Sequence, residues 1–218
     1  MYDSRMDSAH THSASESNAA KWDKRHSGQP SDMWSGHPNE TLLAETSGLA
    51  PGRAVDIGCG EGADAIWLAS HGWQVTGVDI SQVALERAAS NARENGVSVE
   101  WICTDVTANP PTAGGYELVS AHYPALLHSV NDAAIEALLT GVSPGGTLLV
   151  VGHAPIDPEY AISHGFNPDD YIQPADVAAR LDESWTIEVD ETRPRRPTSP
   201  GGSSPHDQDT VLKARRNA

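Results

Sequence analysis

The sequence predicts a single α/β domain, built on a mostly parallel, doubly wound sheet of seven strands with helices on both faces. Three observations support this fold class. From residue 53 onward short apolar runs alternate with helical patterns, a glycine-rich turn follows the first run, and the chain closes with a strand, a loop and a further strand. The chain has 218 residues, enough for one such domain with a buried core.

Two segments precede this alternation. Residues 1–18 are rich in Ser, His, Asp and Asn and nearly lack large apolar side chains, so we expect a disordered tail. Residues 19–50 carry Trp22, Trp34 and several leucines, which predicts one or two helices. These helices either anchor the N-terminus to the core or form a helical lid over a site, within one domain that covers residues 19–218.

The expected strands are short apolar runs, and the second expected helix has the most complete set of signals. Ser81 precedes it as an N-cap, its apolar positions recur on one face, and Asn95-Gly96 ends it. The expected strands are residues 53–57, 74–78, 97–103, 117–121, 146–151, 185–191 and 210–214. The expected helices are residues 63–70, 81–95, 132–139 and 175–181.

Two connections break this rhythm. Residues 153–173 contain prolines, glycines and aromatic residues without a clear period, which indicates a loop over a site. Residues 192–206 are rich in Pro, Gly and Ser and are expected to form a mobile connection. Arg193 and Arg195 belong to a basic group near the C-terminus that we expect on a solvated hairpin edge, with a binding role as the alternative.

Composition narrows the possible partners. The chain has 14 basic and 30 acidic residues and a formal charge of −16, which disfavours binding to nucleic acid. We expect neither a signal peptide nor a membrane span, because the longest apolar run, residues 147–151, is too short to cross a bilayer. Cys59 and Cys103 suit a reduced compartment and should lie too far apart for a disulfide. These features predict a soluble, cytoplasmic protein.

Carboxylates end three successive strands of the predicted sheet. Asp56 ends the first strand, directly before the turn with Gly58 and Gly60, and Asp79 and Asp105 follow the second and third strands. Glycines at a strand-to-helix turn let a ligand approach backbone N–H groups. Because the carboxyl ends of parallel strands meet at one edge of a sheet, the three acids indicate a nucleoside-type cofactor lying across that edge.

These motifs together resemble those of the class I S-adenosylmethionine-dependent methyltransferases. The resemblance is carried by the glycine motif at residues 55–62, by Val78-Asp79-Ile80-Ser81 and by Thr104-Asp105-Val106. It implies a sheet of order 3-2-1-4-5-7-6 with strand 7 antiparallel. Within the family the chain looks most similar to the small-molecule group of tellurite-resistance and thiopurine methyltransferases, on the basis of Trp22, Trp34-Ser35-Gly36 and Pro38-Asn39.

The resemblance implies a set of cofactor contacts. Gly58 and Gly60 would let the methionine part pass close to the backbone, and Asp56 would lie near the ammonium group. Asp79 would accept hydrogen bonds from both ribose hydroxyls, and Asp105 would accept one from the adenine amino group. The other expected cofactor contacts are Trp34, Cys59, Ile80, Val106 and His122.

The acceptor would bind beyond the methyl group. His122, just after the fourth strand, is expected to face both the methyl group and the acceptor, and it is the candidate general base; its alternative is a structural hydrogen-bonded role. Tyr123, His153, Tyr160 and Tyr171 are expected to line the acceptor pocket, although each could instead only pack there. No metal is expected, and the oligomeric state stays open.

Two other functions remain possible at this point. Residues 58–63 also satisfy the G-x-G-x-x-A pattern of dinucleotide sites, with Asp79 in place for a ribose, so an NAD-dependent oxidoreductase is one alternative. That alternative gives no role to Asp56 or Asp105 and puts an acid beside a pyrophosphate. The second is a non-catalytic cofactor-binding protein on the same fold.

The preferred interpretation is transfer of a methyl group, by in-line displacement, to a small molecule. The acceptor atom could belong to a thiol, a hydroxyl, an amine or a chalcogen oxyanion, and a base is optional when the nucleophile is already ionised. Residues 120–124, Ser-Ala-His-Tyr-Pro, differ from the Asn/Asp-Pro-Pro-Tyr motif of amide and adenine methyltransferases. They also lack the cysteine that cytosine carbon methylation would use there.

Overall fold

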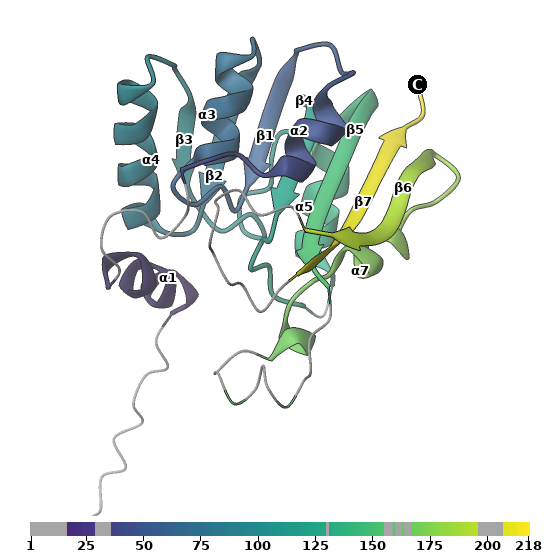
Figure 1. Cartoon of the computed structure of the whole chain (residues 1–218). Coiled ribbons are helices and arrows are strands. Elements are labelled where there is room, and N and C mark those ends of the chain that lie inside the picture. The colour runs from purple at the N-terminus through teal and green to yellow at the C-terminus, as the bar shows by residue number, and fades with distance from the viewer. Residues whose placement is uncertain are drawn as a thin grey trace, which may run out of the picture.

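A computed structural model describes residues 17–28, 36–129, 131–154, 159, 163, 167–195 and 207–218. Its seven strands form one sheet of order β3-β2-β1-β4-β5-β7-β6, in which β7 is antiparallel to both neighbours (Figure 1). This topology confirms the predicted fold. The strands are β1 (Arg53–Ile57), β2 (Gln74–Asp79), β3 (Glu100–Cys103), β4 (Tyr116–His122), β5 (Val142–His153), β6 (Trp185–Pro194) and β7 (Gln208–Arg216).

Helices lie on both faces of this sheet, and the core is divided between the two faces. On one face α5 and α7 pack against β4 and β5 through residues such as Ile135, Leu138 and Leu148. On the other face α2 and α3 contribute Leu42 and Leu68. A parallel sheet needs such cover on both sides, because its strands are apolar in both directions. The helices are α1 (Asn18–Ser27), α2 (Glu40–Thr46), α3 (Ala63–Ser70), α4 (Gln82–Glu94), α5 (Ala133–Gly141) and α7 (Pro174–Ala178), with a 3₁₀ turn η1 (Pro168–Asp170).

The register brings five polar residues to one edge of the sheet. Asp56, Asp79, His122 and His153 lie at or near the carboxyl ends of the parallel strands β1, β2, β4 and β5. Because β7 runs in the opposite direction, its first residues reach the same edge, and Asp209 pairs with His153 across the ladder. The fold therefore gathers the candidate chemistry at a single edge.

The third strand is shorter than predicted. Residues 97–103 were expected to be extended, but β3 begins at Glu100. Gly96 adopts a positive φ of 67°, and the Val97 N–H donates to the Ala92 carbonyl, so the chain remains tied to the end of α4. Residues 97–99, which the alternating pattern assigned to the third strand, therefore belong to the termination of α4.

The N-terminal segment is helical from Asn18, with Ser17 as N-cap accepting from the Ala20 N–H at 3.2 Å. Residues 1–16, the greater part of the predicted tail, lie outside the described residues, as does Trp34. Cys59 and Cys103, both in the described part of the chain, are free thiols, as predicted. None of the helices described is both long and apolar enough to cross a membrane.

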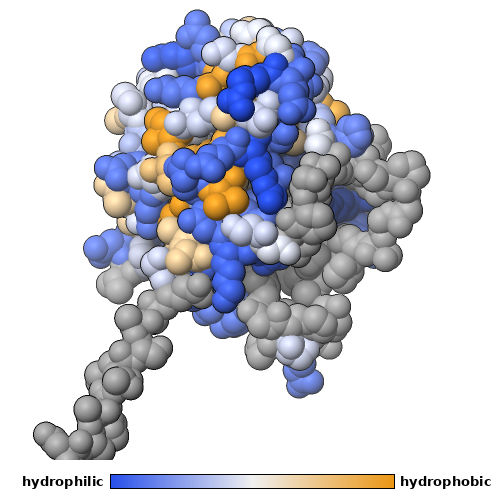
Figure 2. All heavy atoms as spheres, turned by 90° about the vertical axis from the view of Figure 1, so that its left-hand side faces the viewer, coloured by the Kyte–Doolittle hydropathy of each residue, from blue (hydrophilic) through white to orange (hydrophobic). Residues whose placement is uncertain are grey.

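On the face shown in Figure 2, hydrophobic residues lie in small groups between hydrophilic ones, as on an ordinary solvent-exposed surface.

Candidate functional site

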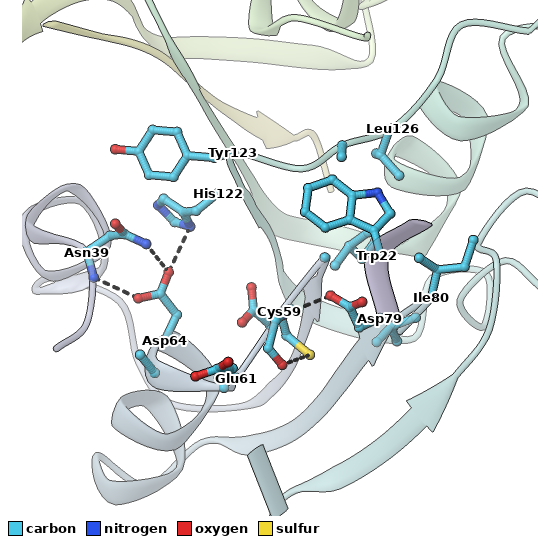
Figure 3. Close-up of a pocket in the computed structure, with 18 of the residues that line it drawn as sticks. Trp22, Asn39, Cys59, Glu61, Asp64, Asp79, Ile80, His122, Tyr123 and Leu126 are labelled. Atoms are coloured by element: carbon cyan, nitrogen blue, oxygen red, sulfur yellow. Dashed lines mark hydrogen bonds and ion pairs between the residues drawn. The ribbon is translucent and has the colours of Figure 1, made fainter. Parts of the chain in front are cut away.

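A cavity of about 1340 Å³ opens at the carboxyl edge of the sheet. Its walls come from the turn between β1 and α3, the ends of β2, β4 and β5, the segment after β3, and residues of α1 (Figure 3). Pockets for a single small ligand measure about 300 to 1,000 Å³. The cavity is therefore large enough for a nucleoside-type cofactor and a second molecule beside it.

The turn between β1 and α3 depends on its glycines. Gly58, Gly60 and Gly62 have φ angles of 70°, 53° and 86°, which side-chain-bearing residues adopt only under strain. At Gly62 a Cβ atom would also lie 2.6 Å from the Trp101 ring. The turn therefore has one tightly packed glycine, while Gly58 and Gly60 present bare backbone to the cavity.

The amides of this turn are already used by the protein. The Gly58 and Cys59 N–H groups both donate to the Val78 carbonyl, at 2.8 and 3.1 Å, and the Gly60 N–H donates to Asp79 Oδ2 at 2.8 Å. A dinucleotide site needs such N–H groups for the pyrophosphate. This hydrogen bonding, with Asp56 beside the start of α3, argues against the NAD-dependent alternative.

Asp79 is positioned to bind a polyhydroxyl ligand. Its two oxygens accept from the Gly60 and Ser81 N–H groups, both at 2.8 Å, which fixes the carboxylate at the end of β2. A carboxylate has about four acceptor positions, so capacity remains for ribose hydroxyls. Burial raises the pKa of Asp79, while these amides oppose the shift. Ile80 and Trp22 lie nearby in the cavity wall (Figure 3).

Helix α1 is attached beside this acid by Asp23. The Asp23 carboxylate accepts from the Ser81 hydroxyl at 2.7 Å and from the Val83 N–H at 3.2 Å, so it adds a second cap to the N-terminus of α4. The Ser81 hydrogen bond is the main reason that the pKa of Asp23 is lowered. This attachment holds Trp22 against the cavity.

A buried ion network makes the second attachment of α1. Glu61, at the glycine turn, lies 3.2 Å from His26 Nδ1 and accepts from Arg87 Nη1 of α4 at 2.7 Å. His26 is the one residue of α1 that is buried. Together the two attachments make α1 part of the wall of the cavity.

Asp56 lies under the glycine turn and is only 2% exposed. It accepts hydrogen bonds from the Ser120 hydroxyl and the Ala65 N–H, yet burial, together with Asp64 and Asp79, raises its pKa well above the usual range. A buried carboxylate in this state is stabilised by a proton or by a cationic group of a ligand. Asp56, Asp79 and the bare glycine backbone thus fit a nucleoside that carries an ammonium group.

A second buried acid, Asp64 of α3, contacts His122. Both Asp64 oxygens accept from Asn39, one from its N–H at 2.7 Å and one from its side-chain amide at 2.8 Å (Figure 3). His122 Nδ1 lies 3.3 Å from Asp64 Oδ2 and 3.1 Å from Ser120 Oγ. Burial lowers the pKa of His122, against the opposing effects of Asp64 and Asp209.

The same residues could also hold a cation. Asp56, Asp64 and His122 each offer one ligand atom, and these atoms lie within 4.8 Å of one another; among the residues described they form the candidate metal group. The expectation that the chain holds no metal therefore stays a prediction.

The far wall of the cavity is a stack of three side chains. The Tyr123 ring lies 4.2 Å from the His153 ring at an interplanar angle of 22°, and the Arg195 guanidinium lies 4.8 Å above the Tyr123 ring. Tyr123 has a φ of 50°, an unusual conformation for a bulky residue and one that is often found at functional sites. Arg195 thus lines the cavity, which corrects its predicted place on a solvated edge.

Asp209 lies behind this wall, at the start of β7. It is 3% exposed, and within the described part of the chain its Oδ1 atom has no hydrogen-bond partner. Burial raises the pKa of Asp209, while Tyr123, Arg195 and His122 oppose the shift.

Most residues predicted for the site lie around this one cavity. The predicted residues that line it are Asp56, Gly58, Cys59, Gly60, Asp79, Ile80, Asp105, Val106, His122, Tyr123 and His153. Tyr171 is not among the described lining residues, and its backbone instead bridges Leu127. Trp34 and Tyr160 lie outside the described residues.

Sequence reasoning missed several residues that contact the site. Asp64 has the pattern of an ordinary acid in the first turn of a helix, and Asp23 that of a surface residue on a polar helix. Asn39 was noted only as part of a resemblance, although its place just before α2 was a signal for a capping residue. Asp209 directly precedes the predicted last strand and had no pattern of its own.

Comparison with known proteins agrees with this geometry. Residues 54–146 match the family described as "Methyltransferase domain". The ribosomal RNA small subunit methyltransferase C of Alcanivorax borkumensis is 32% identical over 108 residues, which cover 47% of this chain and 33% of that protein. The ubiquinone biosynthesis O-methyltransferase of Marinobacter nauticus is 34% identical over 113 residues, 50% of this chain and 47% of that protein.

Solved structures show the same fold over a longer range. The N-methyltransferase NodS from Bradyrhizobium japonicum, in complex with S-adenosyl-L-homocysteine, superposes with a TM-score of 0.69 at 22% identity, covering 93% of this chain and 100% of that one. The two curated relatives named above match over less than half of their own length. Residues 54–146 therefore match a methyltransferase domain, and the strand order and the acids at the strand ends agree with the class I, S-adenosylmethionine-dependent kind.

Proposed function

We propose that the chain transfers the methyl group of S-adenosylmethionine to a small-molecule acceptor. The observation that carries the proposal is one cavity that Asp56, Asp79, His122 and Tyr123 all line. Asp79 lies away from His122 and Tyr123 (Figure 3), and Asp56 lies beside His122, with ligand atoms of the two within 4.8 Å of each other. When bound, S-adenosylmethionine supplies an electrophilic methyl group. The residues of the chain would bind the two molecules, align the acceptor with the methyl group and exclude water.

At the cofactor end the residues have binding roles. Asp79 accepts from ribose hydroxyls, Asp56 lies near the ammonium group, and Asp105 accepts from the adenine amino group. Asp105 lines the cavity, and its Oδ1 is held by the Thr107 N–H at 2.8 Å and hydroxyl at 2.7 Å. Trp22 of α1 covers this end and keeps water away from it.

At the acceptor end His122 is the residue that would accept the proton of the methyl acceptor. Its lowered pKa keeps the imidazole neutral at neutral pH, as a general base requires. Tyr123, His153 and Arg195 bound the space in which the acceptor lies. A wall of stacked rings suits a flat or aromatic acceptor.

A small-molecule acceptor is the finer part of the proposal. It is supported by the cover that α1 gives to the cavity and by the charge of −16, which disfavours RNA. The relatives include enzymes named for ribosomal RNA and for ubiquinone biosynthesis, so the acceptor class has to be tested. The same proposal includes membership of the small-molecule group of tellurite-resistance and thiopurine methyltransferases. It also includes a cytoplasmic location.

The test is release of S-adenosylhomocysteine across a panel of thiols, phenols, heterocyclic amines and chalcogen oxyanions, with ribosomal RNA as a separate arm. Turnover with a small molecule and none with RNA is the expected result. Tight binding of S-adenosylmethionine without any turnover would favour a non-catalytic binding protein. Preference for NAD over S-adenosylmethionine in a titration would reverse the assignment.

A further inference from the structure

The contacts of His122 Nδ1 favour a proton on this atom. Asp64 Oδ2 lies 3.3 Å away in an ion-pair contact, where an ionised carboxylate favours the N–H, and Nδ1 makes its hydrogen bond with Ser120 Oγ at 3.1 Å. Ser120 Oγ, also close to Nδ1, donates to Asp56 and so does not need the imidazole as an acceptor. The arrangement favours the tautomer with a proton on Nδ1 and a lone pair on Nε2.

Asp64 is held rigidly for this contact. Two donors from Asn39, at 2.7 and 2.8 Å, fix both of its oxygens, and the carboxylate is 6% exposed. A buried, hydrogen-bonded carboxylate orients the imidazole and stabilises the positive charge that the ring acquires when it takes a proton.

The other ring nitrogen lacks a partner. His122 Nε2 is buried and makes no hydrogen bond to any part of the chain that the structure describes. A buried polar atom without a partner destabilises the protein, and a ligand that donates a hydrogen bond to it would remove this cost. The His122 side chain is 3% exposed, and the residue belongs to the wall of the cavity.

We propose that Asp64, held by Asn39, is a positioning residue that keeps the proton of His122 on Nδ1, so that Nε2 accepts the proton of the methyl acceptor. The inference rests on the proposed methyl transfer and deepens it, because it selects the acceptor class. The acceptor is a hydroxyl or amine that loses a proton during transfer, and not a nucleophile that arrives ionised.

The step balances as follows. The acceptor oxygen or nitrogen forms a bond to the methyl carbon, and the carbon–sulfur bond breaks with its electron pair remaining on sulfur. The acceptor proton passes to His122 Nε2, and the ring becomes an imidazolium opposite Asp64. Water then takes the proton, and His122 returns to its neutral form.

The charges around His122 suit this cycle. Asp64 faces it from α3, Asp56 from β1 and Asp209 from β7, while the neutral Tyr123 follows it directly after the end of β4. Burial lowers the pKa of His122, and Asp64 and Asp209 oppose this shift. This balance is suited to a base that works near neutral pH.

Asp64→Asn is the test, with Glu117→Gln as control, because Glu117 is a half-exposed carboxylate at the opposite end of β4. Two ring-matched acceptors, phenol and 4-nitrophenol, differ in whether they are ionised at pH 8. Asp64→Asn should lower kcat on phenol by about 10- to 100-fold and on 4-nitrophenol by less than about 3-fold. It should also move the acidic limb of kcat/KM to lower pH. The affinity for S-adenosylhomocysteine should be unchanged in both variants.

A second readout does not depend on turnover. Nitrogen-15 NMR of histidine-labelled protein reports the tautomer of each imidazole, and His122→Gln assigns the signal. We expect the Nδ1–H form in the wild type and its loss in Asp64→Asn. An Nε2–H tautomer in the wild type, or equal losses on the two phenols, would overturn the proposal.

Three further outcomes are decisive. If the wild type methylates thiols but neither hydroxyls nor amines, the proposed function stands and this inference fails. If no acceptor of any kind is methylated, the proposed function itself fails. If EDTA abolishes turnover and Mg²⁺ or Mn²⁺ shifts the His122 signal, the cluster is a metal site and Asp64 is a ligand.

Discussion

The two ends of the cavity satisfy their polar groups in different ways. At the cofactor end, Asp79 accepts hydrogen bonds from the Gly60 and Ser81 N–H groups, and Asp105 accepts from the N–H and the hydroxyl of Thr107. At the acceptor end, His122 Nε2 and Asp209 Oδ1 are buried and have no hydrogen-bond partner in the part of the chain described.

This difference indicates a division of labour. The cofactor end is prearranged by backbone hydrogen bonds, so it binds by the remaining lone pairs of acids that are already in place. At the acceptor end the buried His122 Nε2 and Asp209 Oδ1 atoms destabilise the protein, and a ligand that hydrogen-bonds to them would remove this cost. Changes at the first end should therefore act on affinity or folding, and changes at the second on turnover.

The largest effect should come from the acceptor end. His122→Gln removes the base and should lower kcat on a phenol by about 10²- to 10⁴-fold, with affinity for S-adenosylhomocysteine within about 2-fold of the wild type. Steady-state kinetics and isothermal titration measure the two quantities. His71→Gln, at the exposed end of α3, is the matched control. A parallel loss of cofactor affinity would contradict the division between the two ends.

Gly62→Ala should affect folding of the cofactor end. The new Cβ atom would lie 2.6 Å from the Trp101 ring at a φ of 86°, and strain with overpacking should cost roughly 2 to 5 kcal/mol of unfolding free energy. Gly145→Ala is the control, because its φ is 77° and the space around it is open. Urea denaturation of both variants separates the packing contribution from the backbone contribution; equal losses would show that Trp101 moves aside.

Asp79→Ala should weaken binding of S-adenosylhomocysteine by about 2 to 3 kcal/mol, since ribose hydroxyls and two amides lose their acceptor. Titration calorimetry gives the change. Asp79→Asn, which keeps one acceptor oxygen, should lose less. If affinity does not change, the ribose binds elsewhere.

Asp56→Asn should stabilise the protein without cofactor at pH 7, because the variant has no buried carboxylate to ionise. The folded state raises the pKa of Asp56, mainly through burial, so it binds that proton more tightly than the unfolded state. Stability therefore falls as pH rises from the unfolded pKa through the folded one, and the variant removes this fall. Thermal melts from pH 4 to pH 8 test the sign; a wild type that gains stability relative to the variant over this range would refute it.

The strand-end acids and the glycine turn were predictable because their signal is local. Asp56 and Asp79 lie in the last positions of β1 and β2, Asp105 comes shortly after β3, and parallel strands bring such positions to one edge. The same local patterns predicted the number of strands and the position of His122 at the carboxyl edge of the sheet. The short β3 was the weak point, because the end of α4 and the start of an edge strand compete for the same residues.

Other features depend on contacts between distant segments and could not be read from the chain. Asn39 meets Asp64 across 25 positions, and Asp23 meets Ser81 across 58. Asp209 reaches the edge only because β7 runs antiparallel. A polar side chain has the same local pattern whether it is solvated or paired, so its burial and its partner are decided when the helices pack on the sheet.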